Sequence, residues 1–302
     1  AYSNRLLEIF ILPSCDELNM GDEALDKQSG SIVTSFWTKP IVFVLSTLVF
    51  SWVFWAPIVA GIVSIESDVA VYLIVAGGFG PTFGALLGVS LFGDSIRSWL
   101  AEILSLPTSA GWVAVVLLIP PSVLALTAIV HVGIGDVTFG FDPRIGLIGY
   151  PISIVSIALL GGGQEEFGWR GYLLPALRTR WGKLPSSILV GIVWAGWHTP
   201  LFLVPGTDQS HLPFVSYVLL VLAASVLLTW IFESSGSSLP LAMLFHGGLN
   251  AYAYYPAGGL SAVRTPLGYS LIAIIYLGLA ILVVLGPFRR PTFSETYTQV
   301  NV

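Results

Sequence analysis

Long apolar runs with few charges recur along almost the whole chain, and they restrict the fold more than any other feature. Runs of about 18 or more apolar residues are long enough to cross the hydrocarbon core of a bilayer as helices. Of the 302 residues, 55% are hydrophobic and only 10% are charged, whereas a soluble domain carries about 25% charged residues. Backbone groups inside a bilayer must find hydrogen bonds within the protein, which favours helices over open strands. The sequence therefore predicts an all-α, polytopic integral membrane protein.

The apolar runs predict about eight transmembrane helices around a polar intramembrane cavity. The predicted spans cover residues 41–63, 69–92, 112–132, 145–162, 185–204, 213–232, 240–255 and 267–285. The seventh run is short for a hydrocarbon core about 30 Å thick. The fourth leads directly into a charged stretch, where residues 164–177 predict a short helix that either re-enters the membrane or continues the span. The membrane domain then covers residues 41–288, between an acidic N-terminal tail at 1–40 and a C-terminal tail at 289–302.

Lysine and arginine are distributed unevenly between the two sides of this predicted topology. With eight spans, both termini lie on the same side as the second, fourth and sixth loops. That side carries nine basic residues, namely Arg5, Lys27, Lys39, Arg97, Arg178, Arg180, Lys183, Arg289 and Arg290. The other side carries two, Arg144 and Arg264. Because cytoplasmic loops are enriched in lysine and arginine, we expect both termini in the cytoplasm and the protein in the plasma membrane of a prokaryote.

The N-terminal tail differs in composition from the rest of the chain. Its acidic residues are Asp16, Glu17, Asp22, Glu23 and Asp26. A short apolar patch at Leu6–Leu12 is not preceded by a basic region, which tells against a secretory signal peptide. We interpret the tail as flexible and cytoplasmic. The single cysteine, Cys15, cannot form an intramolecular disulfide, and a net charge of −5 argues against nucleic-acid binding.

Ionisable side chains within the apolar runs are the candidates for function, because charge at membrane depth is costly. The polar candidates are Glu165, Glu166, Arg170, His198, His246 and Asn250. Two further histidines are weaker candidates. We expect His211, in a loop, to be exposed to solvent, and His131, at the end of a span, to serve packing.

The charged stretch GGGQEEFGWR contains an acidic pair and one arginine. On a helix, Glu166 and Arg170 are four residues apart with the acid first, the favoured arrangement for an ion pair. Glu165 lies about 100° further round such a helix and has no partner three or four residues away. We therefore expect Glu165 to find its partner on another helix, and a histidine is the natural choice.

The histidines lie in two later runs, GIVWAGWHTP and FHGGLN. His246 and Asn250 are four residues apart, so both side chains project from one helix face. Trp194 and His198 repeat this spacing, and we expect the indole to pack beside the imidazole.

Each candidate alone has a structural explanation, since a histidine in a span often bonds a neighbouring helix and a Glu–Arg pair can brace its own. Together they favour chemistry. A carboxylate with an imidazole can deprotonate water, and an imidazole with a carboxamide can hydrogen-bond a developing oxyanion. These are the groups that peptide hydrolysis requires.

Three of these stretches also match motifs in order. EEFGWR fits EExxxR, WAGWH fits an aromatic residue followed by xxxH, and HGGLN fits HxxxN. Over residues 145–255 the chain resembles the CAAX prenyl endopeptidase and bacteriocin-processing (CPBP, or Abi) family of intramembrane proteases, in which phenylalanine is common at the position of Trp194. The resemblance implies eight helices around a cavity open to the membrane and the cytoplasm. It also implies cleavage near the end of a membrane-associated or prenylated peptide or protein.

The resemblance further implies a role for each candidate. Glu165 would activate water with help from His198, and His246 and Asn250 would stabilise the oxyanion. The remaining motif residues, Glu166, Arg170 and Trp194, would support the site. Family members are described both as metalloproteases and as glutamate-dependent proteases. The chain has no HExxH motif, so we expect no cofactor, with zinc bound by Glu165, His198 and His246 as the alternative.

Two other functions remain open on the sequence. A transporter also buries charges on broken helices, although here the polar residues gather in the second half and no inverted repeat is evident. A non-catalytic scaffold or immunity protein of the same fold would keep the motifs and bind a segment without cutting it. Prenylated CAAX tails, peptide precursors and membrane-protein termini all remain open as substrates.

The positions of the glycines support two further predictions. Gly80, Gly84 and Gly88 form one face of the second span, which favours close helix packing within the chain. Gly161–Gly163 directly before the glutamates predict a helix break that turns backbone groups toward a wet cavity.

Overall fold

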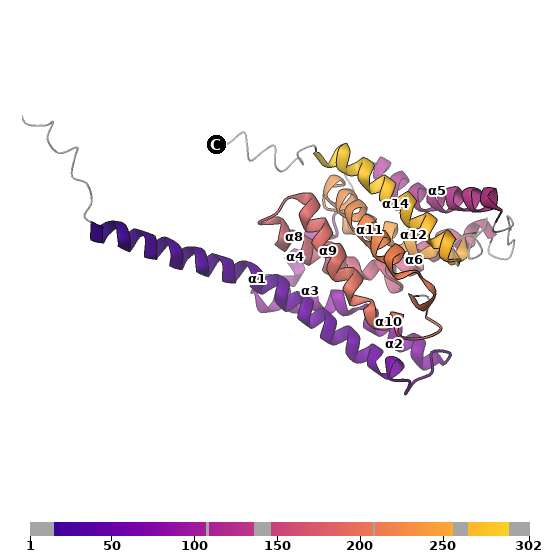
Figure 1. Cartoon of the computed structure of the whole chain (residues 1–302), viewed down its shortest axis with the longest axis horizontal. Helices are drawn as coiled ribbons and strands as arrows, with labels where there is room; N and C mark the ends of the chain where they lie inside the picture. Colours follow the sequence, from indigo (N-terminus) through magenta and orange to yellow (C-terminus); the bar gives the residue numbers. More distant parts are fainter. Residues whose placement is uncertain (1–14, 107–108, 136–145, 208, 256–264, 290–302) are drawn as a thin grey trace, which may run out of the picture.

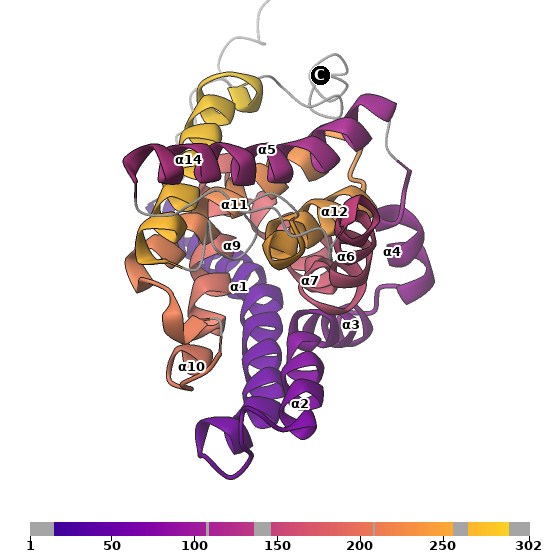
Figure 2. The same ribbon diagram turned by 90° about the vertical axis from the view of Figure 1, so that its right-hand side faces the viewer.

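The computed structural model describes residues 15–106, 109–135, 146–207, 209–255 and 265–289, and these residues form helices and no strand (Figures 1 and 2). The predicted all-α class is confirmed. The four longest helices are α1 (Cys15–Val59), α5 (Ala110–Ile134), α11 (Phe214–Ser234) and α14 (Pro266–Leu285). The shorter helices are α2 (Asp68–Gly78), α3 (Gly80–Leu91), α4 (Ile96–Ile103), α6 (Gly146–Leu160), α7 (Glu166–Gly168), α8 (Leu174–Arg178), α9 (Lys183–Trp197), α10 (Thr199–Phe202) and α12 (Leu239–Asn250).

Five of the described helical segments are long and apolar enough to cross a membrane, so the chain is an integral membrane protein. They are Phe36–Val59, Asp68–Leu91, Ala110–Ile134, Phe214–Ser234 and Pro266–Leu285. The three other predicted spans correspond to α6 and α9, of 15 residues each, and α12, of 12 residues. At 1.5 Å per residue these helices are roughly 18–22 Å long, shorter than a bilayer core of about 30 Å. The predicted number of eight spans is therefore not confirmed.

Several predicted boundaries differ from the observed helix ends. Helix α1 begins at Cys15, so the second part of the predicted tail is helical, while the apolar patch Leu6–Leu12 lies outside the described residues. The predicted second span is two helices that meet at Phe79, directly before the Gly80–Pro81 pair. Proline has no backbone N–H to continue the hydrogen-bond ladder of α2, so a new helix begins there.

The helices pack as pairs around α11 and α12 (Figure 2). Helix α11 contacts α9 and α14, and α12 contacts α5 and α6. Helix α1 contacts α2 and α3 on the other side of the molecule. These pairs leave the ends of α9 and α12 facing one another across the bundle interior, where the candidate residues lie.

The glycine face on α3 packs within the chain, as predicted. A Cβ at Gly80 would collide with the Ser51 hydroxyl of α1, and one at Gly84 would collide with the Thr47 hydroxyl. At Gly88 a Cβ would collide with the ring of Tyr172. Glycine therefore allows α3 to approach both α1 and the segment after α7 at backbone distance.

The loops with basic residues lie together at one end of the bundle, which we call the basic end. It contains the described residues Lys39, Arg97, Arg178, Arg180 and Lys183. The contacts that join its segments are Lys39–Asp94 at 3.4 Å, Arg178–Glu233 at 2.7 Å, the Phe36 and Trp181 rings at 5.4 Å, and Ser105 Oγ to Gly236 O at 3.1 Å. The loops at residues 60–67 and 203–213 lie at the other end of α1, α9 and α11, which we call the far end (Figure 1).

Candidate active site

Three glycines end α6 and turn the chain toward the bundle interior. Gly162 has a φ of +136°, which residues with a Cβ rarely adopt. The backbone groups released here are hydrogen-bonded by side chains. Gln164 Oε1 accepts the Gly162 N–H at 2.8 Å, and Asn250 Nδ2 donates to Gly161 O at 3.0 Å. The predicted helix break is confirmed.

The charged stretch continues from α6 as a series of short helical turns. It forms a 3₁₀ turn at Gly163–Glu165, then α7, a π-helical turn at Trp169–Leu173, and α8. Helix α8 ends at Arg178, which pairs with Glu233 at the basic end. π-Helical turns insert an extra residue into a helix and are frequent at functional sites.

The partners of Glu165 are two tryptophans. Its Oε2 accepts hydrogen bonds from Trp194 Nε1 at 2.9 Å and from Trp169 Nε1 at 3.2 Å. Our expectations that Glu165 has no partner four residues away and pairs with a histidine are therefore wrong. Trp169 is that fourth residue, and the i, i+4 spacing places its indole on the same helix face as Glu165. Within the described ranges, no hydrogen bond from the protein reaches the second oxygen, Oε1.

Glu166 and Arg170 form the predicted ion pair. Arg170 Nη1 lies 3.0 Å from Glu166 Oε2 and donates to Oε1 at 3.2 Å, and both side chains are fully buried. Arg170 Nη2 donates to Ser225 O at 3.1 Å and to Ser225 Oγ at 3.0 Å, which ties the pair to α11. The guanidinium also lies 5.4 Å from the ring centre of Trp194. Arg170 Nε has no hydrogen-bond partner in the described part of the chain, so the buried pair is held by its remaining contacts.

His246 pairs with the second glutamate of the motif, not with the first. Its Nδ1 lies 2.7 Å from Glu166 Oε1, and both side chains are buried. A carboxylate only accepts hydrogen bonds, so Nδ1 carries the proton and Nε2 is left to act at the site. Glu166 therefore orients His246 as well as neutralising Arg170.

His198 lies at the junction of α9 and α10. Its Nδ1 is 3.0 Å from Trp194 O, and because a carbonyl only accepts, Nδ1 donates and Nε2 is again free. Its ring packs most closely on Trp197, with centroids 4.4 Å apart, and lies 6.4 Å from Trp194. The Trp194 ring is closer to His246, at 5.0 Å. Our expectation that this indole packs beside His198 is thus only partly met.

The break between α9 and α10 follows from local hydrogen bonding. Pro200 stands in the first turn of α10, and Leu201 N–H bonds His198 O at 2.9 Å, not Trp197 O. The Trp197 carbonyl that is left over accepts from Trp52 Nε1 at 3.0 Å. An indole from α1 thereby stabilises the helix end that carries His198.

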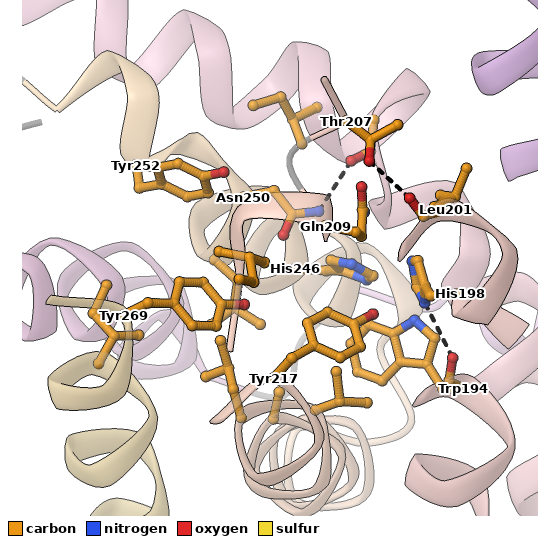
Figure 3. Close-up of a pocket in the computed structure, with 18 of the residues that line it drawn as sticks. Trp194, His198, Leu201, Thr207, Gln209, Tyr217, His246, Asn250, Tyr252 and Tyr269 are labelled. Carbon is orange, nitrogen blue, oxygen red and sulfur yellow. Dashed lines mark hydrogen bonds between the residues drawn. The ribbon is translucent and has the colours of Figure 1, made fainter. Parts of the chain in front are cut away.

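The three motifs meet at a cavity of about 680 Å³ (Figure 3). His198, His246, Asn250 and Trp194 all line it, together with Tyr217 of α11. The two glutamates do not form its wall; they lie behind Trp194 and His246, with Glu165 retaining 5% of its exposure and Glu166 none. The structure thus places two imidazoles and a carboxamide on the cavity, backed by two carboxylates.

The alternative zinc ligands are Glu165, His198 and His246. Within the described ranges, no three His, Cys, Asp or Glu side chains are grouped to hold one ion. Glu165, His198 and His246 are therefore not arranged as the three-ligand zinc site that the sequence allowed. One oxygen of Glu165 and one nitrogen of each histidine are already hydrogen-bonded to protein groups.

The two weaker histidine candidates lie where we expected. His211 is exposed in the far-end loop. His131 is fully buried in α5, with Nε2 3.3 Å from Thr265 Oγ1.

Sequence reasoning missed four residues of the site: Gln164, Trp169, Tyr217 and Ser225. Trp169 had a signal, since it lies four residues after Glu165 inside the motif. Tyr217 and Ser225 had none, because both come from α11, which carries no motif.

Two comparisons with known proteins agree with this geometry. Residues 147–252 match the family model of the type II CAAX prenyl endopeptidase Rce1-like proteins. The chain is also similar to CAAX prenyl protease 2 of Methanococcus maripaludis, with 25% identity over 227 residues, which cover 71% of this chain and 84% of that protein. The matched segment contains all three motifs and the five residues named above on the cavity wall. Over residues 147–252 the chain is therefore similar to the type II CAAX prenyl endopeptidases, the family that its motifs resemble.

Proposed function

We propose that this protein is an intramembrane endopeptidase that hydrolyses a peptide bond near the end of a membrane-anchored or prenylated peptide or protein. The observation that carries the proposal is that three motifs meet beside one cavity. Two contacts join the first motif to the other two. Glu166 holds His246, and Trp194 holds Glu165. The match to the type II CAAX prenyl endopeptidase model and the similarity to a protein named CAAX prenyl protease 2 support the same reaction.

Glu165 is the base in this proposal. Its Oε2 is held by two indoles, so Oε1 is the oxygen that accepts a proton from water. His198 assists through Nε2, which accepts the second hydrogen of the same water, since its Nδ1–H faces a carbonyl. The hydroxide equivalent then attacks the carbonyl carbon of the scissile bond.

His246 and Asn250 stabilise the resulting oxyanion. Asn250 has a second amide hydrogen beyond the one given to Gly161 O. His246 donates from Nε2 when it is protonated on both nitrogens, while the Glu166 carboxylate accepts the hydrogen bond from Nδ1. Collapse of the intermediate breaks the C–N bond, and protonated Glu165 returns its proton to the leaving amine.

We propose that the reaction needs no metal. Support comes from the arrangement of Glu165, His198 and His246, which are not grouped as ligands among the described residues. Asparagine is also an unusual zinc ligand, whereas the His246–Asn250 pair suits two donors on one oxygen.

We also propose that both termini are cytoplasmic. The clustering of the described basic residues at one end supports this, because cytoplasmic segments are enriched in lysine and arginine.

Cleavage of a farnesylated CAAX peptide by the purified protein in detergent, read by mass, tests the proposed activity. Glu165→Gln keeps the shape of the side chain but removes the base, and we expect it to abolish cleavage while the protein stays folded. Asn250→Ala should lower kcat by about 10²–10³ if it donates to the oxyanion. Exposed Thr179→Ala at the basic end is the matched control and should keep full activity.

The outcomes separate the rival functions. Full activity of Glu165→Gln contradicts the mechanism. Tight binding of the peptide by the unaltered protein with no cleavage indicates the scaffold function instead.

Metal removal tests the metal-free reaction. We expect activity to survive dialysis against a strong chelator, and elemental analysis to find less than one zinc per chain in active protein. Loss of activity on chelation, with recovery on adding zinc, contradicts the proposal and assigns the ligands among Glu165, His198 and His246.

A further inference from the structure

Tyr217 brings a hydroxyl group to the cavity wall that the proposed mechanism does not use. It lies in the first turn of α11, lines the cavity and retains 6% of its exposure. Its ring meets the His198 ring edge to face, with centroids 5.7 Å apart and an interplanar angle of 73°. Its centroid also lies 4.9 Å from that of Phe202. The ring is therefore held on two sides, and its direction is fixed by packing.

The hydroxyl of Tyr217 is available to a molecule in the cavity. Within the described part of the chain, no residue forms a hydrogen bond with Tyr217 Oη, yet this oxygen is not one of the fully buried atoms that lack a partner. The hydroxyls of Tyr150 and Tyr172, in contrast, are buried in that way. Figure 3 shows the Tyr217 hydroxyl directed toward His246 and His198. A nearly buried side chain thus presents a hydrogen-bonding group to the two catalytic imidazoles.

The proposed oxyanion site has room for another donor. His246 carries a proton on Nδ1, which faces Glu166, so a neutral His246 has no hydrogen on Nε2. Asn250 then has one amide hydrogen to give, because Gly161 O accepts the other. The tyrosine hydroxyl is a neutral donor and needs no added proton to act.

The attacking water has less need of this hydroxyl. In the proposed mechanism its two hydrogens are accepted by Glu165 Oε1 and His198 Nε2, which already orient it. The carbonyl oxygen, in contrast, becomes negative during the reaction, and a fixed donor aimed at it gains strength as the charge develops.

We infer that Tyr217 is a further catalytic residue, whose hydroxyl donates a hydrogen bond to the carbonyl oxygen of the scissile bond as that oxygen becomes negative. The inference rests on the proposed peptide hydrolysis. It adds α11, which carries no motif, to the elements that act on the substrate.

Tyr217→Phe tests the role of the hydroxyl. The change removes one oxygen and keeps the ring that packs on His198 and Phe202. We expect kcat for a farnesylated CAAX peptide to fall by about 10²–10³, with KM nearly unchanged, because the donor acts mainly in the transition state. Tyr150→Phe is the matched control: Tyr150 is also buried, its hydroxyl also lacks a partner among the described residues, and it does not line the cavity. This control should keep full activity, and both variants should unfold at the temperature of the unaltered protein.

A thioamide substrate separates a donor to the carbonyl oxygen from a residue that only holds His198 in place. Sulfur accepts hydrogen bonds weakly, so replacing the scissile carbonyl oxygen by sulfur should slow the unaltered protein more than it slows Tyr217→Phe. We expect the ratio of the two rates, amide over thioamide, to fall about tenfold or more in the variant. An unchanged ratio, or an unchanged kcat, overturns the inference.

Binding of an uncleavable analogue distinguishes failure of this inference from failure of the proposed function. A phosphinate in place of the amide after the farnesylated cysteine presents charged oxygens like those of the tetrahedral intermediate. We expect Tyr217→Phe to bind this analogue about tenfold or more weakly than the unaltered protein does, and to bind the ordinary peptide equally well. If the unaltered protein binds the peptide but does not cleave it, the proposed hydrolysis fails, while weaker phosphinate binding by Tyr217→Phe still supports the hydrogen bond. Equal phosphinate binding by the two proteins overturns the inference about Tyr217.

Discussion

Arg170 shows how one side chain can connect the three parts of the site. Its guanidinium contacts Glu166 in its own segment and Ser225 on α11, while Glu166 in turn holds His246 on α12. Ser225 Oγ donates onward to Ser187 O of α9. Removing the arginine would leave a buried carboxylate with only the histidine as a charged partner, and such broken pairs are costly.

Arg170→Ala should therefore lower the free energy of unfolding by about 3–5 kcal/mol. Thermal unfolding in detergent measures the change, and activity should fall with the amount of folded protein. The control is Arg180→Ala, since Arg180 is exposed and contacts the Phe36 ring at 5.4 Å; we expect a change of about 0.5 kcal/mol or less. Full stability of Arg170→Ala with no activity would mean that Arg170 acts directly in catalysis.

The motif residues could be predicted from the sequence, but their pairing could only be predicted in part. Regular helical spacing gave the Glu166–Arg170 pair correctly. The same spacing places Trp169 four residues after Glu165, a contact that the expectation for Glu165 overlooked. That His246 pairs with Glu166 and not with Glu165 depends on how α12 packs against the charged stretch. The contributions of Tyr217 and Ser225 depend on how α11 packs, which no local pattern records.

At the scale of elements, broken helices create the site. The chain bends at Gly162 and again at His198, and each bend frees a backbone carbonyl that a side chain from another helix bonds. The space beside Gly162 is limited, since a Cβ there would lie 2.8 Å from His246 Nε2. A side chain at this position would press on the two oxyanion donors.

Gly162→Ala should lower kcat at least 100-fold, because the methyl group displaces His246 and Asn250 and a small misplacement of catalytic groups is costly. Peptide cleavage measures the loss. Gly61→Ala is the matched control: Gly61 also has a positive φ, +70°, but nothing lies within 4 Å of its added Cβ. It shares the backbone strain, about 1–3 kcal/mol, and should keep its activity per folded molecule. Equal activity of the two variants would contradict the proposed position of the donors.

The helices themselves were easier to predict than their ends. Long apolar runs gave α5, α11 and α14 within a few residues. The second and fifth runs were each predicted as one helix but are two, since Pro81 and Pro200 begin new helices without changing the hydropathy. Hydropathy predicts which segments can lie in a membrane, but it does not predict where the backbone hydrogen bonds of a helix are interrupted.

At the scale of the whole molecule, basic residues lie at one end of the bundle, and the loops at 60–67 and 203–213 at the other end contribute residues to the cavity lining. The first part of α1 projects from the charged end, away from the other helices (Figure 1). Two of the nine basic residues lie in this part of the sequence: Lys27 in the helix and Arg5 before it. Neither the cavity nor the main charge difference depends on this part.

Removal of residues 1–33 should therefore leave both cleavage and orientation unchanged. Seven basic residues would still face two, which keeps the bias that orients the chain. Peptide cleavage in detergent measures the activity. Reaction of the exposed Thr179→Cys position with a membrane-impermeant maleimide in inverted vesicles measures the orientation. A tenfold loss of cleavage would show that the projecting helix takes part in the site.

The π-helical turn at Trp169–Leu173 also fixes how the residues before it are rotated about the helix axis relative to the residues after it. Glu166 lies before it and is aimed at His246, while Arg178 lies after it and is aimed at Glu233. Each residue advances a helix by about 100°, so deleting one residue from the turn would rotate one end against the other by that angle. Either partner could then be reached, but not both at once. The number of residues in this turn, independent of their identity, therefore allows the Glu166–His246 contact in the interior and the Arg178–Glu233 contact at the surface to form together.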